Sequence, residues 1–160
     1  MKKALLAGFF LGFFILSSSS LTPLSVDAQY DGRWGSSYRT KINKLDDDEV
    51  DDLPVPILFG VTLRMITPNF GDDRDGGSRS HEGEDILAPE GAPIVSPTEA
   101  VVIRTGTGSG SGKYVTTANP GGESFVYMHL SEISVKAGDE LDVGDLIGLV
   151  GDTGNAKGGP

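Results

Sequence analysis

The stretch GDELDVGDLIGLVG, residues 138–151, spaces four glycines along a short apolar segment. A second stretch, GAPIVSPTEAVV at residues 91–102, has the same order of features: a glycine, a short apolar element, a turn and a further apolar element. Short apolar runs between turn residues are typical of β-strands, whereas an amphipathic helix needs a longer apolar face with a period of about 3.6 residues. The two stretches therefore predict a pair of β-β corners folded against each other.

The same composition extends from Pro54 to the end of the chain. Of the 23 glycines, 18 lie at or after Gly71, and no window in this part shows a sustained helical period. Many short strands with turns between them indicate a sandwich or barrel. Residues 54–160 are thus expected to form one all-β domain, an antiparallel β-sandwich or barrel-sandwich-like fold with Gly-rich loops, with strands at 57–65, 93–96, 100–104, 114–117, 124–129 and 146–150.

The first 28 residues have the pattern of an export signal. Lys2 and Lys3 precede an uncharged apolar run at residues 4–16, and Val26 and Ala28 supply small residues at the positions that a signal peptidase reads. The run is shorter than the roughly 20 residues of a membrane span. We expect a cleaved signal peptide and an exported protein in the periplasm, cell wall or medium, with no stable membrane span. An uncleaved segment would instead anchor the protein to the membrane.

Residues 29–53 are predicted to be an acidic flexible linker. They contain DDDEVDD, residues 46–52, in which six of seven positions are acidic, and a block of like charges repels itself and stays solvated. A weak calcium-binding segment is the alternative interpretation.

Charge and cysteine content exclude several classes of function. The chain has a net charge of −10, and removal of residues 1–28 would leave 11 basic and 22 acidic side chains, or −11. This balance argues against nucleic acid and anionic lipid as partners, because both are bound through Lys and Arg. The chain has no cysteine, so a transition-metal site must use His, Asp or Glu.

A candidate metal-binding pair lies in SRSHEGEDILAPEGAPIVSP, residues 78–97. His81 and Asp85 are four residues apart, and glycines on both sides favour a loop that leads into a strand over a helix. Neutral imidazole and carboxylate suit Zn²⁺, which in catalytic sites takes three protein ligands and keeps one position open. The pair by itself also fits a polar loop without a metal.

The second histidine, His129, lies in SFVYMHLSEI, residues 124–133. Strict alternation along a strand would place Phe125, Tyr127 and His129 on one face. A histidine at the end of a buried strand can be packed and hydrogen-bonded without any catalytic role.

Four local patterns together resemble the lysostaphin-like zinc metallopeptidases, which cut peptide bonds in peptidoglycan. HEGEDILAPEGAPIVSP resembles the family's H-x-G-x-D block and the turn after it, and YMHLS its Y-x-H-L-S block. VKAGDELDVGDLIGLVGDTGN resembles its glycine-paced segment, and NFGDDRDGGSRSH its F-G-x-R approach to the metal. The resemblance covers residues 67–160.

This resemblance implies a monomeric zinc metalloendopeptidase that hydrolyses peptidoglycan peptides with a metal-activated water. His81 and Asp85 match two ligands of one zinc ion, and His129 matches a catalytic histidine that stabilises charge on the scissile carbonyl. Arg74 and Tyr127 match positions that flank the site or contact substrate.

The resemblance is incomplete at the C-terminus. The family's third ligand lies in an H-x-H block that follows the segment matched by GDTGNAKGGP, and the chain has only two histidines. We expect either a chain that continues into that block or a non-catalytic cell-wall binding or regulatory module that keeps the fold.

Two other classes fit less well. An EF-hand-like loop starting at Gly71 would have no ligand at its first position and no flanking helices. A biotinyl or lipoyl carrier needs a lysine on an exposed hairpin tip, and neither Lys113 nor Lys136 has that setting.

Overall fold

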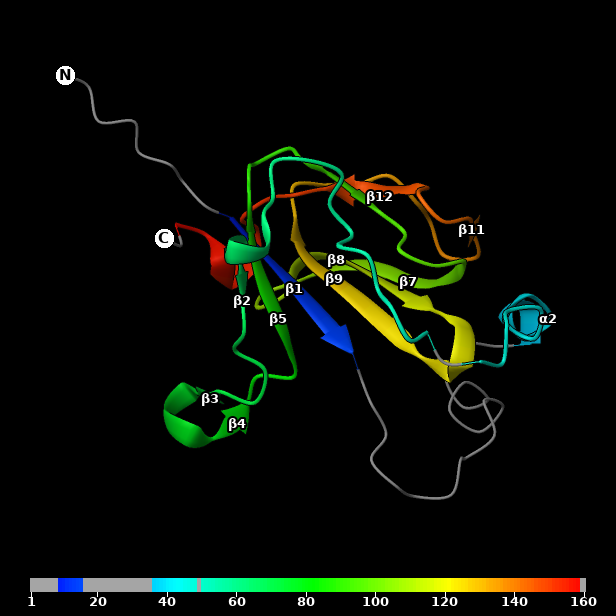
Figure 1. Cartoon of the computed structure of the whole chain (residues 1–160), viewed down its shortest axis with the longest axis horizontal. Helices are drawn as coiled ribbons and strands as arrows, with labels where there is room; N and C mark the ends of the chain where they lie inside the picture. The colour runs from blue at the N-terminus through cyan, green and yellow to red at the C-terminus, as the bar shows by residue number, and fades with distance from the viewer. Residues whose placement is uncertain (1–8, 16–35, 49, 159–160) are drawn as a thin grey trace.

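The computed structural model describes residues 9–15, 36–48 and 50–158 (Figure 1). Most of the expected signal peptide, residues 1–8 and 16–28, and the first part of the expected linker lie outside these ranges. Within them the chain is nearly all β, which confirms the predicted fold class. No helix in the described ranges is long and apolar enough to cross a membrane.

Two antiparallel sheets and one small hairpin make up the domain. The larger sheet has seven strands and the smaller one three, and the hairpin pairs β3 (Asp73–Arg74) with β4 (Arg79–Ser80). In spatial order the larger sheet consists of β11 (Glu140–Leu141), β7 (Ala100–Gly108), β8 (Gly112–Ala118), β9 (Ser124–Leu130), β1 (Phe9–Ile15), β5 (Gly83–Ala88) and β2 (Ile66–Thr67). The smaller sheet consists of β10 (Glu132–Ile133), β12 (Leu146–Leu149) and β6 (Pro93–Val95).

The two glycine-paced stretches, residues 91–102 and 138–151, pair with each other through both of their strands. Strand β6 pairs with β12, and β7 pairs with β11, so residues 91–102 and 138–151 cross from one sheet to the other together. The corners of the two stretches are joined by hydrogen bonds from the Ser96 amide to the Asp145 carbonyl and from the Gly144 amide to the Ser96 carbonyl. The predicted pair of β-β corners is confirmed.

The main core lies between the sheets. Ile94 and Ile147 of the smaller sheet are fully buried in one apolar cluster with Phe125, Tyr127 and Leu130 of β9. Burial of side chains of this size stabilises the fold by about 1.5–3 kcal/mol each. Because residues 84, 86 and 88 of β5 alternate with 85 and 87, Ile86 on the core face leaves Asp85 on the opposite face.

The opposite face of the larger sheet is covered at one end by helix α2 (Ser36–Ile42). Ile42 is buried against Val101, Ile103 and Ala118 of β7 and β8. Residues 29–53 were expected to be a solvated linker, and this packed helix is a departure from that expectation. Its cause is tertiary, because a seven-residue helix is too short to be stable alone and depends on the sheet beneath it.

The largest error in the predicted strands concerns residues 57–65. Only Ile57 pairs there, through a single bridge to Ile94, and Leu63–Met65 form a 3-10 turn. Gly60 has a φ of 83°, which breaks the extended run, and Leu58 and Phe59 are exposed. The other predicted strands are present with shifted ends, and the strand after the His81 loop is β5, which begins at Gly83.

Strand β1 lies in the middle of the larger sheet, between β5 and β9 (Figure 1). Gly12 is paired opposite Asp85, and Phe13 opposite both Glu84 and Tyr127. These residues belong to the expected signal peptide. Its cleavage would remove the strand and leave β5 and β9 as two unpaired edges facing each other, and unpaired edges tend to pair with other segments.

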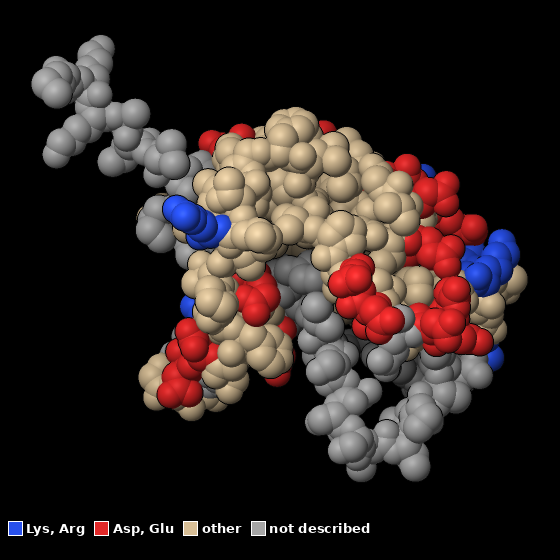
Figure 2. Space-filling model, in the orientation of Figure 1, with Lys and Arg blue, Asp and Glu red and all other residues tan. Residues whose placement is uncertain are grey.

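Acidic side chains flank the face shown in Figure 2. They gather on the β3–β4 hairpin and along the opposite edge near α2 and β11, where a smaller group of basic side chains lies beside them, with Lys41 and Lys44 paired to Glu140. This distribution agrees with the net charge of −10.

Candidate metal centre

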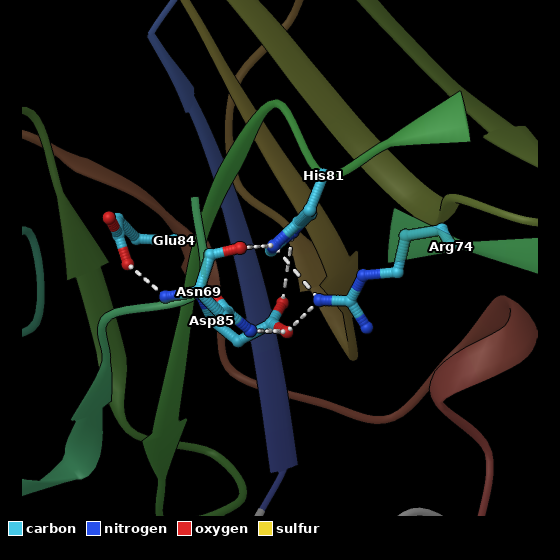
Figure 3. Close-up of polar contacts among 5 residues, drawn as sticks. All are labelled: Asn69, Arg74, His81, Glu84 and Asp85. Carbon is cyan, nitrogen blue, oxygen red and sulfur yellow. Dashed lines mark hydrogen bonds and ion pairs between the residues drawn. The ribbon is translucent and has the colours of Figure 1, made fainter. Parts of the chain in front are cut away.

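His81 and Asp85 come together where the hairpin enters the larger sheet (Figure 3). His81 lies between β4 and β5, and its backbone is fixed by hydrogen bonds between its amide and the Asp72 carbonyl and between its carbonyl and the Gly71 amide. Asp85 projects from β5, with Oδ1 3.5 Å from Nε2 of His81. Both side chains are buried. The predicted arrangement of a loop leading into a strand is therefore present.

The second carboxylate oxygen of Asp85 is occupied by two donors. Asn69 Nδ2 donates to Oδ2 over 2.6 Å, and Arg74 Nη2 forms an ion pair with the same atom at 2.8 Å. Arg74 is on β3 and half-buried, so the hairpin brings its guanidinium to the pair, as Figure 3 shows. Asp85 thus presents Oδ1, and not Oδ2, toward His81.

The pair fits two ligands of one zinc ion. Ligand atoms about 2.1 Å from a tetrahedral ion lie about 3.4 Å from each other, and Nε2 and Oδ1 are 3.5 Å apart. Among the described residues, no group of three His, Cys, Asp or Glu side chains could hold a metal. His81 Nε2 and Asp85 Oδ1 are thus two candidate ligands, where a catalytic zinc takes three from the protein.

His129 lies at a bulge in β9. Val115 pairs with Tyr127 and Lys113 with Leu130, so β9 has one residue more than β8 in this interval. His129 has a φ of 62°, and it is the only non-glycine residue with positive φ in the described part of the chain. Leu130 takes the place in the core that strict alternation gives to His129. The predicted common face of Phe125, Tyr127 and His129 is therefore wrong at its last member.

The bulge turns His129 to the same sheet face as Asp85. Both residues lie on the side away from the main core, and β1 separates their strands. Strands two positions apart are roughly 10 Å apart. A side chain on the intervening strand opposite Asp85 would point to the same face, and in this structure that position is Gly12.

The His129 ring is oriented by a backbone carbonyl. Nδ1 lies 2.8 Å from the Thr153 carbonyl oxygen, and since a carbonyl only accepts, Nδ1 carries the proton. The Thr153 hydroxyl donates to the Leu130 carbonyl and accepts from the Lys113 amide, so it ties β8 and β9 together beside the bulge. This arrangement leaves Nε2 as the atom of the neutral ring that can accept a proton.

Tyr127 does not flank the site in this structure. It is fully buried in the main core with Phe125, on the opposite sheet face from Asp85. Burial raises the pKa of its phenol well above the usual range, with a hydrogen bond involving Thr117 acting in the opposite direction. Its role as a substrate-contacting residue is thus not supported by its position.

Two residues at the site were missed by the sequence analysis. Asn69 contacts both His81 and Asp85, and Thr153 orients His129. Asn69 stands directly before Phe70-Gly71, and Thr153 lies in the glycine-paced tail, so both are in segments that carried the family resemblance. Only their contacts across the fold distinguish them from neighbouring polar residues.

Together the two-sheet fold and the buried His–Asp pair define a lysostaphin-like metallopeptidase domain. The family profile described as Peptidase family M23 matches residues 79–160, and the chain belongs to this family. The family and the fold inferred from the sequence are confirmed.

Individual relatives agree with this assignment. The peptidoglycan DD-endopeptidase ShyC of Vibrio cholerae is 31% identical over 100 residues, which are 60% of this chain and 23% of ShyC. The catalytic domain of lysostaphin from Staphylococcus simulans is 29% identical with a TM-score of 0.51, over 56% of this chain and 69% of that domain. A zinc-containing peptidase from Vibrio cholerae is 27% identical with a TM-score of 0.52, over 64% of this chain and 34% of that one. The chain spans well under half the length of the curated relatives it matches, 38% in one case and 23% for ShyC.

Proposed function

We propose that this protein is an exported zinc metalloendopeptidase that hydrolyses peptide bonds in bacterial cell-wall peptidoglycan. The observation that carries the proposal is the buried pair of His81 Nε2 and Asp85 Oδ1, held 3.5 Å apart while two donors occupy the other Asp85 oxygen. A buried carboxylate is costly unless its charge is compensated, and this one is compensated on one oxygen and presented on the other. The relation to ShyC supports peptidoglycan as the substrate.

His81 and Asp85 would hold a single zinc ion together with a third ligand from a strand in the position of β1. That position lies between β5 and β9, so its outward side chains share a face with Asp85 and His129. The residue opposite Asp85 on that strand would lie within about 5 Å of it, Cβ to Cβ. A histidine at that position would complete the set of three ligands.

When bound, zinc polarises the scissile carbonyl and activates water at neutral pH. His129 would be the catalytic base. Because Nδ1–H is bonded to the Thr153 carbonyl, Nε2 can take the proton of the attacking water. Once protonated, it can donate a hydrogen bond to the carbonyl oxygen on which negative charge develops.

The substrate would lie extended across the β5–β9 part of the sheet. Helix α2 already covers the same face over β7 and β8, where Ile42 packs on Val101. Helix α2 would therefore bound the substrate position on the β7–β8 side, beyond His129 of β9. Arg74 stands at the other side of the site and would act on the substrate only after leaving Asp85.

The test uses the full-length protein and isolated peptidoglycan sacculi. Release of soluble cross-link fragments is measured by chromatography and mass spectrometry, and zinc content by atomic emission. We expect one zinc per protein in the wild type and loss of zinc and activity in Asp85→Ala. We expect His129→Ala to retain zinc and lose activity. Asp139→Ala, on an exposed turn, is the control that should leave both unchanged.

The outcomes separate the competing functions. A wild type that holds no zinc and releases no fragments, yet binds sacculi, would show the non-catalytic wall-binding module instead. Zinc at wild-type stoichiometry in Asp85→Ala would show that the ligand assignment is wrong.

A further inference from the structure

We infer that Asn69 is a positioning residue that presents both presumed ligands to the metal, an inference that rests on the proposed function. Its side-chain Nδ2 donates to Asp85 Oδ2 at 2.6 Å, and its backbone carbonyl lies 3.1 Å from His81 Nδ1. One residue therefore contacts the far side of each ligand, as Figure 3 shows.

The contact with Asp85 selects the oxygen that binds. A carboxylate with both oxygens open can rotate and bind an ion through either one or through both. The donors from Asn69 and Arg74 converge on Oδ2, which fixes the plane of the carboxylate and directs Oδ1 toward His81. Asn69 donates through an uncharged amide, so it fixes the carboxylate without adding a charge that would repel the cation.

The contact with His81 selects the ring nitrogen that binds. Nδ1 has two neighbours with opposite requirements, the Asn69 carbonyl at 3.1 Å and Arg74 Nη2 at 2.9 Å. The carbonyl needs a proton on Nδ1, whereas the guanidinium needs a lone pair there. With the proton on Nδ1, Nε2 carries the lone pair toward Asp85 Oδ1, which is the metal-binding tautomer. The Asn69 carbonyl thus favours this tautomer, and Arg74 favours the other one.

Asn69 is itself held rigidly enough for this role. It is 8% exposed, its amide donates to the Thr67 carbonyl at 2.8 Å, and its Oδ1 accepts from the Asp85 amide at 3.3 Å. The side chain therefore bridges the turn after β2 to the backbone of β5 at the residue that carries the ligand. Such outer partners commonly change metal affinity 10- to 100-fold when they are removed.

The test compares Asn69→Ala with Asn119→Ala in the full-length protein. Asn119 is also buried and bonded through its side chain, to Thr98 and Thr117, and these contacts include neither ligand. Zinc affinity is measured by competition with a chromophoric chelator, and thermal unfolding is recorded on the zinc-free proteins. We expect Asn69→Ala to weaken zinc binding 10- to 100-fold. We expect Asn119→Ala to lower the melting temperature and to change zinc affinity less than threefold.

Equal zinc affinity in Asn69→Ala and wild type would overturn the inference, and so would an equal loss in both variants. If Asn69→Ala does not fold, Asn69→Ser replaces it, because its shorter hydroxyl fills part of the space without reaching Asp85 Oδ2. A wild type that binds no zinc would refute the proposed function instead, so the two failures are distinguishable.

The tautomer is tested separately by nitrogen-15 NMR of the His81 ring. In the zinc-loaded protein we expect a proton on Nδ1 and the metal on Nε2. In the zinc-free protein, Arg74→Gln should raise the share of the Nδ1–H tautomer, because the competing donor is weakened. Zinc bound through Nδ1, or no change on Arg74→Gln, would contradict the role of the Asn69 carbonyl.

Discussion

Glycine at position 129 should give a more stable protein than alanine at the same position. Both substitutions remove the imidazole and its hydrogen bond to Thr153, so these losses cancel in the comparison. The remaining difference in stability comes from the backbone. Residue 129 has a φ of 62°, a conformation in which any residue with a Cβ is strained.

The magnitude follows from two opposing effects. Left-handed backbone costs an L-residue about 1–2 kcal/mol, which glycine avoids. Glycine loses about 0.5–1 kcal/mol through the greater freedom of the unfolded chain. The net advantage of His129→Gly over His129→Ala is therefore about 0.5–1 kcal/mol. With a urea m-value of about 1.5 kcal/mol/M, the midpoint should differ by about 0.5 M.

The assay is urea unfolding of full-length variants, with Val126 as the control position. Val126 lies on the same strand in regular pairing with Thr116, so Val126→Gly should be less stable than Val126→Ala by about 0.5–1 kcal/mol. The sign of the difference is thus opposite at the two positions. If glycine were the less stable residue at both, the bulge would not be strained at His129 and the reasoning would fail. Both variants at 129 should be inactive on sacculi.

Three further substitutions have defined outcomes. Gly112→Ala should lower both stability and activity, because a Cβ at this position would overlap Thr153, which orients His129. Gly91→Ala has a similar positive φ but open space around the Cβ, so it should lower stability only. Equal activities of the two variants would contradict this reasoning. Tyr127→Phe should flatten the fall in folding stability at alkaline pH. Burial raises the pKa of the Tyr127 phenol in the folded protein, so its contribution to stability is fully present below the unfolded pKa of about 10. Above pH 10 the free energy of unfolding of the wild type falls by up to about 1.4 kcal/mol per pH unit. Asp139→Asn should flatten the fall in folding stability at acid pH. Hydrogen bonds from the Lys136 backbone amide and side chain lower the pKa of Asp139 in the folded protein. The contribution of Asp139 to stability is therefore present above the unfolded pKa and is lost as the pH falls through the folded pKa. Unchanged profiles in urea titrations across pH would refute the last two.

Much of the fold was predictable because it is encoded locally. Turn residues between short apolar runs identified five of the six predicted strands, and the similarity of residues 91–102 and 138–151 identified the two corners that pair. The strand predicted at residues 57–65 is wrong because an apolar run does not show whether a partner strand is available, and only Ile57 finds one. Helix α2 was missed because its stability comes from Val101 and Ile103 beneath it.

The sequence by itself determined the antiparallel β fold, the family and the His81–Asp85 pair, because strand periodicity and a spacing of four residues are properties of neighbouring positions. Only the tertiary structure decided which face His129 occupies, since the bulge depends on β9 having one residue more than its partner strand β8. It also placed Tyr127 in the core and brought Asn69 and Thr153 to the two histidines. These contacts join residues that are 12 to 24 positions apart, and hydrogen bonds over such distances are fixed by the pairing of strands and not by the local pattern.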